Sequence, residues 1–69
     1  MFEIGDIVRV LVPGEFHGQE KPVLQTHRSK NGKVSYLVAV VWPKPEHERP
    51  SWFDPDDLEL IKPINERSL

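Results

Sequence analysis

Phe2-Glu3-Ile4-Gly5-Asp6-Ile7-Val8-Arg9-Val10-Leu11-Val12 is the stretch that most strongly indicates a fold, because a glycine-aspartate turn leads directly into a β-branched run. Glycine accepts a positive φ and aspartate can hydrogen-bond nearby backbone, so Gly5-Asp6 predicts a tight turn that fixes where the next strand begins. In a strand over residues 7–12, successive side chains point to opposite faces, and both faces are apolar except at Arg9. This pattern is typical of a strand packed on both sides. The opening of the chain therefore predicts a small β-barrel.

A hairpin is the next strongest local signal. Seven prolines and four glycines divide the chain into short β-branched pieces without a sustained 3.6-residue periodicity, which favours strands over helices. Residues 13–21 predict a long first loop, and residues 23–28 and 34–42 predict two antiparallel strands. Asn31-Gly32 lies between them and is preferred in two-residue type I′ turns. Counting outward from such a turn places Tyr36 opposite His27.

The C-terminal part predicts the remaining elements of a five-stranded domain. We expect a proline-rich loop over 42–50, a short strand over 51–53, one helical turn in Asp54-Pro55-Asp56-Asp57 with Asp54 as its cap, a closing strand over 58–61 and a frayed tail over 63–69. The expected fold class is all-β: a single five-stranded SH3-like barrel with one short 3-10 turn before the last strand. Residues 1–69 form one domain in this interpretation.

Composition excludes several classes of site. The chain has 69 residues and no cysteine, so disulfides, thiolate metal sites and cysteine nucleophiles are excluded. His17, His27 and His47 fit no local metal-binding spacing, and the aspartates of residues 54–57 lack the glycine and distal glutamate of a calcium loop. We therefore expect no metal and no cofactor.

Length and hydropathy bear on location and assembly. No apolar run approaches the roughly 20 residues needed to span a bilayer, and no secretory signal opens the chain, so we expect a cytoplasmic protein without membrane contact. A chain this short buries only roughly 60% of its unfolded surface. Its thin stability margin is compatible with a homo-oligomer or a stable complex, because binding to the folded form adds stability.

Charge is distributed unevenly along a chain whose net charge is −2. The charged side chains of residues 21–45 are all basic, whereas residues 46–59 contain six acids against Arg49. The acidic segment could bind a basic partner, and the basic segment could bind phosphate groups through its positive charges.

The predicted architecture resembles the SH3-like small barrels over residues 2–62. The Phe-x-x-Gly-Asp-x-Val-x-Val opening at residues 2–10 is similar to the Tudor-like and ribosomal-type binding modules, to the small barrel protein of photosystem I and to the barrel domain of nitrile hydratase beta chains. This resemblance implies a binding module or a small accessory protein of a larger complex. It assigns no site, because one fold supports many unrelated functions.

The order of segments also resembles the MazF-type toxins, which are SH3-like ribonucleases. The similarity covers residues 5–10, the segment ending at Lys21-Pro22 and residues 55–62. The resemblance implies an acid and an arginine in the first loop, but this chain has Phe16 at the acid position, with Glu15 one residue away, and Lys21 at the arginine position. A lysine is a poor substitute for an arginine that clamps a phosphate.

Aromatic side chains supply the preferred functional candidates. Adjacent Trp52 and Phe53 point to opposite faces of a strand, so one is expected in the core and the other at the surface. Tyr36, Trp42, Trp52, Phe53 and Phe16 are the residues available to line a binding groove. The preferred hypothesis is a non-catalytic protein-interaction module. Its expected partner-binding residues are Glu15, Phe16, His17, Trp42, Trp52 and Asp54.

Two alternatives remain open at this point. A nucleic-acid-binding module would use the basic hairpin, with Lys21, Arg28, Lys30 and Lys33 as the phosphate contacts. A pI of about 5.8 stands against it, since dedicated nucleic-acid domains usually exceed roughly 9. A degenerate MazF-type ribonuclease, with Lys21 and Glu15 near the catalytic positions, is the third hypothesis.

Overall fold

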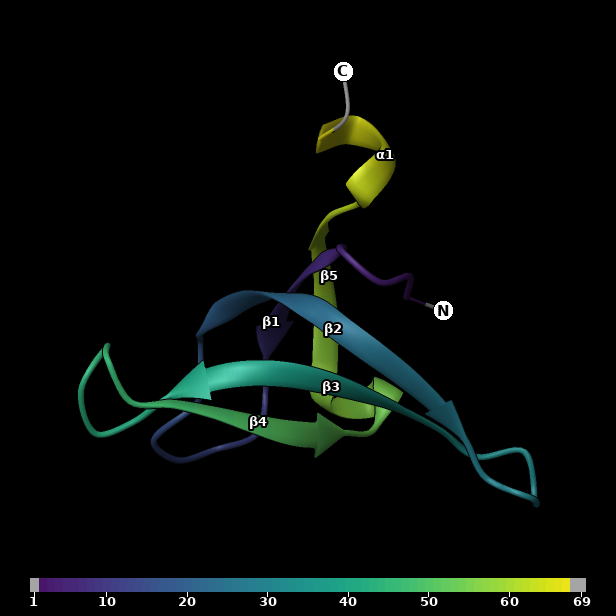
Figure 1. The fold of residues 1–69 in the computed structure, drawn as a ribbon, viewed down its shortest axis with the longest axis horizontal. Helices are drawn as coiled ribbons and strands as arrows, with labels where there is room; N and C mark the ends of the chain where they lie inside the picture. The colour runs from purple at the N-terminus through teal and green to yellow at the C-terminus, as the bar shows by residue number, and fades with distance from the viewer. Residues whose placement is uncertain (1, 68–69) are drawn as a thin grey trace.

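The computed structural model describes residues 2–67 and is an all-β fold (Figure 1). Its elements are β1 (Ile7–Val10), β2 (Glu20–Arg28), β3 (Val34–Val41), β4 (Glu48–Phe53), the 3-10 turn η1 (Pro55–Asp57), β5 (Leu58–Lys62) and the four-residue helix α1 (Ile64–Arg67). The predicted all-β class, the five strands and the 3-10 turn before the last strand are confirmed.

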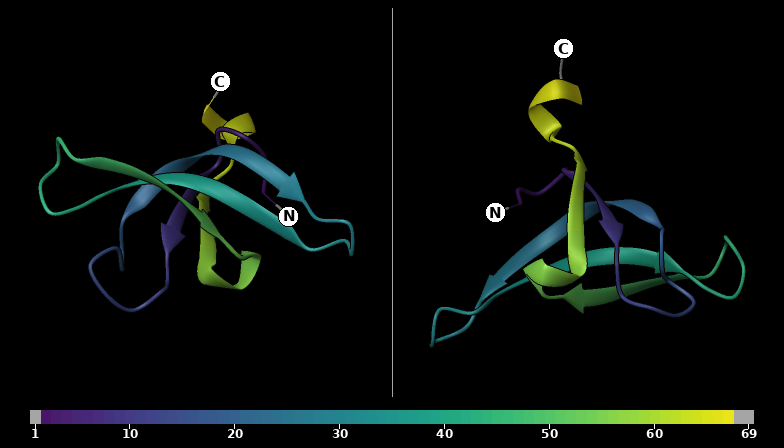
Figure 2. Two further views of the ribbon diagram at one scale, coloured as in Figure 1. Left: turned by 60° about the horizontal axis from the view of Figure 1, so that its bottom comes forward. Right: turned by 180° about the vertical axis from the view of Figure 1, so that it is seen from behind.

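The five strands form one antiparallel sheet in the order β4-β3-β2-β1-β5. β2 is shared between two halves of this sheet: residues 20–22 pair with β1, and residues 23–28 pair with β3. The strand bends between these halves, so that β5 runs across the direction of β3 and β4 (Figures 1 and 2). β4 and β5 end the order without pairing to each other within residues 2–67, so the sheet is open and the expected closure into a barrel is not present.

The core lies where the two halves of the sheet face each other. Its buried apolar side chains are Val8, Val10, Val23, Tyr36, Val38, Val40, Phe53 and Leu58. β3 contributes every second residue to this core, which is the period of a strand with one buried face. Tyr36 is therefore fully buried in the core, and it is not an exposed residue of a surface groove. Phe2 packs edge-on against it, with ring centroids 5.0 Å apart.

The β2-β3 hairpin differs from its prediction by one residue. The Ser29 N–H donates to the Lys33 carbonyl at 2.8 Å, and Gly32, at a φ of +85°, donates to the Ser29 carbonyl at 3.0 Å. These bonds enclose a three-residue turn, in which the last residue takes the left-handed conformation. Tyr36 consequently lies opposite Thr26 rather than His27, and an irregularity between Val23 and Gln25 shifts the register once more.

Several strand limits also differ from those expected. β1 ends at Val10 and buries only one face, because Arg9 on the other face forms ion pairs with neighbouring strands. β2 begins earlier than expected, and β4 extends over residues that were expected in the proline-rich loop. Asp54 is the N-cap residue of η1, as expected, but its side chain makes no capping hydrogen bond.

The Gly5-Asp6 turn joins the two ends of the described chain. Gly5 has a φ of +97°, and a Cβ at this position would overlap the Ile64 side chain. The carboxylate of Asp6, only 4% exposed, accepts hydrogen bonds from the Glu3 N–H and the Ile64 N–H, both at 2.8 Å. This turn therefore starts β1 and also positions the beginning of α1. Residues 68–69 of the expected frayed tail lie outside the described residues.

Candidate functional site

The solvent-facing side of β2, β3 and β4, which we term the outer face, carries the most unusual surface of the molecule. Because Tyr36, Val38 and Val40 point into the core, the alternate β3 residues Leu37, Ala39 and Val41 point outward. An antiparallel sheet with one solvated face ordinarily alternates apolar and polar residues. β3, the central of these three strands, is apolar on both faces from Tyr36 to Val41.

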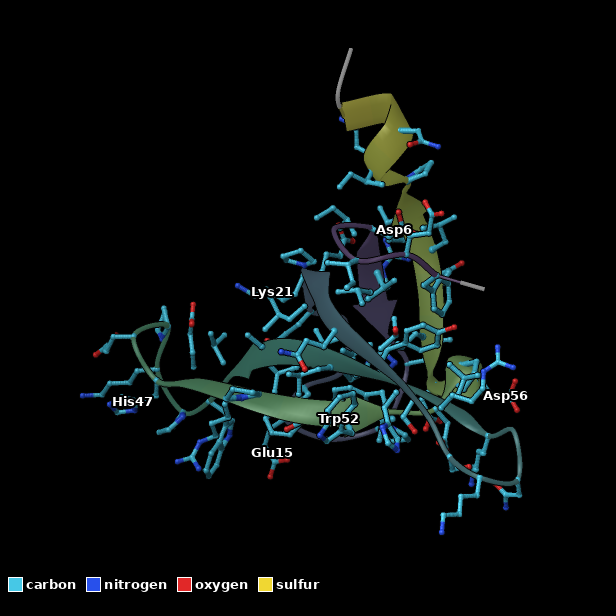
Figure 3. All side chains as sticks on the ribbon, turned by 45° about the vertical axis from the view of Figure 1, so that its right-hand side comes forward. Asp6, Glu15, Lys21, His47, Trp52 and Asp56 are labelled. Carbon is cyan, nitrogen blue, oxygen red and sulfur yellow. The ribbon has the colours of Figure 1, made fainter. Side chains whose placement is uncertain are left out.

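Trp52 on β4 extends this apolar surface. The register places it beside Leu37, and Ala39 lies beside Pro50. The Trp52 side chain is 51% exposed, whereas its neighbour Phe53 is buried, so the expected division of these two aromatic residues is confirmed. Trp52 lies on β4 (Figure 3), and the His27 ring of β2 approaches it edge-on, with ring centroids 6.1 Å apart.

Acidic groups border Trp52 at both ends of β4. Glu48 begins the strand, and Asp54 follows its end. Residues 46–57 contain five acids and one base, namely Glu46, Glu48, Asp54, Asp56 and Asp57 against Arg49. Lys33 approaches Asp54 at 4.0 Å, with both side chains exposed, so this contact only partly offsets the negative charge.

Arg49 is directed toward Trp42. Its Nε donates to the Trp42 carbonyl at 2.8 Å, and its guanidinium lies 5.7 Å from the centre of the indole ring. Trp42 also donates its N–H to the His47 carbonyl at 3.1 Å, and its peptide bond to Pro43 is cis. Although 42% exposed, Trp42 therefore holds the β3-β4 loop together.

Gln19 ties the first loop to this same end of the sheet. Its side-chain amide donates to the Val41 carbonyl at 2.7 Å and accepts from the Val41 N–H at 2.9 Å, as a neighbouring strand would. The nearby Phe16 packs partly buried against the core, while Glu15 and His17 are exposed. Sequence reasoning missed this structural link of Gln19, because a lone glutamine in a polar loop carries no signal.

The expected partner-binding residues consequently fall into two groups. The loop containing Glu15, Phe16 and His17 is linked through Gln19 to the end of β3 that precedes Trp42. Trp52 and Asp54 lie further along β4: Trp42 bonds to His47, which is five positions before Trp52, or roughly 16 Å along an extended strand. The two groups lie on separate parts of the surface.

The residues expected to contact phosphates also lie in two separate places. Arg28, Lys30 and Lys33 gather at the β2-β3 hairpin, whereas Lys21 lies half-buried at the start of β2, opposite Val8. Arg9 is not part of this set, because it pairs with Glu20 at 2.7 Å and with Glu59 at 3.2 Å. The hydrogen bond that Arg9 donates to the Glu20 carboxylate is the main cause that raises the pKa of Arg9.

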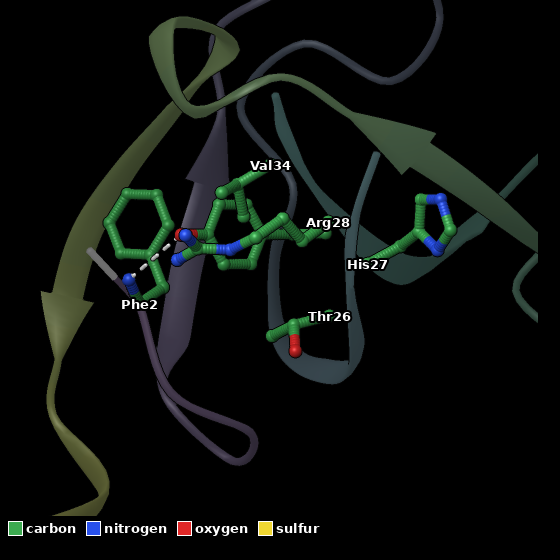
Figure 4. Close-up of a pocket in the computed structure, with 6 residues that line it drawn as sticks. Phe2, Thr26, His27, Arg28 and Val34 are labelled. Carbon is green, nitrogen blue, oxygen red and sulfur yellow. Dashed lines mark hydrogen bonds between the residues drawn. The ribbon is translucent and has the colours of Figure 1, made fainter. Parts of the chain in front are cut away.

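A pocket opens beside the hairpin, on the inner side of β2 and β3 (Figure 4). Its volume is about 120 Å³, and its lining residues are Phe2, Thr26, His27, Arg28, Val34 and Tyr36. Pockets for whole small-molecule ligands usually measure about 300–1,000 Å³. This pocket is large enough for a single chemical group.

Within residues 2–67, no three histidine or acidic side chains gather closely enough to hold a metal ion. None of the helices in these residues is long and apolar enough to cross a membrane.

Comparison with known proteins supplies no relative: no family model, no curated protein and no solved structure matches the chain. The function of the chain is therefore inferred from the residues of the site.

Proposed function

We propose that this chain is a non-catalytic protein-interaction module, which docks a basic and partly apolar segment of a partner protein on its outer face. The observation that carries the proposal is the exposed Trp52 beside Leu37, on a solvent-facing sheet surface that is apolar along its middle strand. Exposed tryptophans are enriched among the residues that dominate binding energy at protein interfaces.

The chemistry of the partner follows from the border of this surface. Glu48 and Asp54 lie at opposite ends of β4, and only one base lies among the five acids of residues 46–57. A lysine or arginine of the partner can pair with these carboxylates while its charge lies over the Trp52 ring. An acidic partner would meet like charges at both ends.

Docking on the face is favoured over addition of a strand at the edge of the sheet. β4 is an edge strand, and edge strands can pair with an extended peptide. Pro50 lies in the middle of β4 and has no N–H to donate. A proline at this position weakens strand addition but leaves the side chains of the outer face accessible.

Site-specific photocrosslinking in the native host tests the proposal. A benzophenone amino acid replaces Trp52 in one variant and Trp42 in another, so that both probes substitute one exposed aromatic residue for another. We expect the benzophenone at position 52 to crosslink to a defined protein segment that contains lysine or arginine next to apolar residues. The Trp42 probe is the matched control and is expected to give much less of the same product, because Arg49 covers part of that ring.

Four outcomes of this experiment would contradict the proposal. They are a product containing nucleic acid, a product with an acidic segment, a crosslink only to a second copy of this chain, and equal capture of one protein by both probes. A second copy of this chain is the other molecule that could occupy the outer face, since association would stabilise the fold of so small a domain.

A nucleic-acid-binding module is the second candidate, and one observation favours it. Among residues 2–67, the side chains of Arg28 and Lys30 form no ion pair with an acid, so both charges are available to phosphates. A gel shift with single-stranded RNA and DNA at low and moderate salt tests this candidate. Binding that weakens steeply with salt and is lost in Lys30→Gln would support it; no shift at low salt would exclude it.

The architecture and location proposed with this function are an SH3-like domain in the cytoplasm. The strand order, the 3-10 turn before β5 and the absence of cysteine support them. A MazF-type ribonuclease is the least favoured function, because Lys21 is half-buried opposite Val8 while Glu15 lies exposed in the first loop.

A further inference from the structure

The pocket beside the hairpin lies on the opposite side of the sheet from Trp52. Thr26 pairs with Tyr36 and Arg28 pairs with Val34, and these residues point to the same side of the sheet as the core. The His27 ring is turned away from Phe2 (Figure 4) and contacts Trp52 on the outer face. His27 is the lining residue that the pocket shares with the proposed docking surface.

Hydrogen-bond donors dominate the polar part of this pocket. The buried Tyr36 hydroxyl accepts the Phe2 N–H at 3.3 Å, which holds Phe2 at the wall of the pocket. Arg28 brings five N–H donors, and its side chain extends toward Phe2 (Figure 4). Within residues 2–67 the Arg28 side chain forms no hydrogen bond or ion pair, and no aspartate or glutamate lines the pocket.

The rest of the lining is apolar. The rings of Phe2 and Tyr36 and the side chain of Val34 form this part of the wall. A volume of about 120 Å³ accommodates a charged head group with a few carbon atoms and excludes a whole nucleotide.

We propose that this pocket binds an oxyanion head group, a carboxylate or a phosphate, carried on a short apolar stem. Arg28 is the principal ligand, because a guanidinium pairs with two oxygens of either group in one plane. The apolar stem of the ligand packs against Phe2 and Val34.

Amide chemical-shift titration of the full chain tests this site. The probes are propionate, inorganic phosphate and propionamide, the neutral counterpart of propionate. We expect saturable shifts confined to residues 2, 26–28 and 34–36 with at least one of the two anions, and none with propionamide. Propionate and phosphate distinguish the two sources of the head group.

Two variants decide whether Arg28 is responsible. Arg28→Gln is expected to weaken anion binding at least about tenfold, the loss typical of one charged hydrogen bond. Lys30→Gln removes a neighbouring exposed charge that does not line the pocket, and it is expected to leave the affinity within about twofold. Arg28 is exposed, so its replacement leaves the core intact.

Three outcomes would overturn the proposal. The first is the absence of saturable shifts with both anions. The second is equal binding of propionamide, which would identify a purely apolar pocket. The third is an equal loss of affinity in Arg28→Gln and Lys30→Gln, which would identify general attraction to the basic hairpin.

Discussion

The inner and the outer face of β3 carry similar side chains in different surroundings. Tyr36, Val38 and Val40 are fully buried on the inner face, whereas Leu37 and Ala39 are partly exposed on the outer face. Burial of the inner residues stabilises the fold, because it removes their apolar surface from water. The outer residues give little of this stabilisation in the isolated chain, and they are the surface on which we propose that a partner docks.

The largest expected contrast between these faces is in stability. Val38→Ala should lower the free energy of unfolding by about 2 kcal/mol, since it removes two buried methyl groups and leaves a cavity. Leu37→Ala, the adjacent outer residue, should cost less than about 1 kcal/mol although it removes more atoms. Urea denaturation followed by circular dichroism measures both. Equal losses would show that the outer face is also part of the core.

The next effect concerns the end of the outer face, where Gln19 bonds to Val41. Gln19→Ala should destabilise the fold by about 1–2 kcal/mol, because the Val41 N–H and carbonyl lose their partners. Gln25→Ala is the control, since the Gln25 side chain forms no hydrogen bond within residues 2–67. Faster amide hydrogen exchange at Val41 in Gln19→Ala alone would locate the effect. An unchanged exchange rate there would contradict it.

The two exposed tryptophans should respond in opposite ways. Trp42→Ala should cost about 0.5–1 kcal/mol of stability, the typical contribution of an exposed cation-π contact. Trp52→Ala should change stability by less than about 0.5 kcal/mol and abolish most partner binding. Thermal melting and the crosslinking described above measure the two properties. A large loss of stability in Trp52→Ala would assign this residue to the fold.

The smallest expected effect is at the ion pair between Lys33 and Asp54. Lys33→Gln should change stability by less than about 0.5 kcal/mol, because both groups are exposed and 4.0 Å apart. It should strengthen binding of a basic partner severalfold at low salt, since it removes a positive charge beside Asp54. Isothermal titration at two salt concentrations checks the change, and weaker binding would contradict the proposed polarity of the surface.

The sequence predicted those parts of the fold that local chemistry determines. Gly5-Asp6, the helical turn at Pro55 and the opposite orientations of Trp52 and Phe53 all follow from conformational preference or from the period of a strand. The hairpin register was wrong because Asn31-Gly32 is compatible with both a two-residue and a three-residue turn. Hydrogen bonds of the Ser29 side chain with Asn31 and Lys33 accompany the longer turn, and they become visible only in three dimensions.

The candidate site was less predictable than the fold. The sequence offered the aromatic residues as candidates, but it did not show which of them are buried. The burial of Tyr36 depends on the register of β3, and a shift of one residue would turn this side chain to the other face of the sheet. The separation of Trp42 from Trp52 depends on the extent of β4, and the pocket at Arg28 depends on the approach of Phe2 from the other end of the sequence. Contacts between residues far apart in the chain cannot be recognised from a short stretch of sequence.

The most direct test of the central claim is a chemical-shift map of the full chain with a designed peptide. The probe alternates lysine and leucine, and the control peptide has glutamate at every lysine position. The account predicts that the lysine peptide shifts the amides of Leu37, Ala39 and Trp52 and leaves those of Val8 and Val10 unchanged, with no comparable effect of the glutamate peptide. Equal shifts with both peptides, or shifts confined to the hairpin at Arg28 and Lys30, would contradict it.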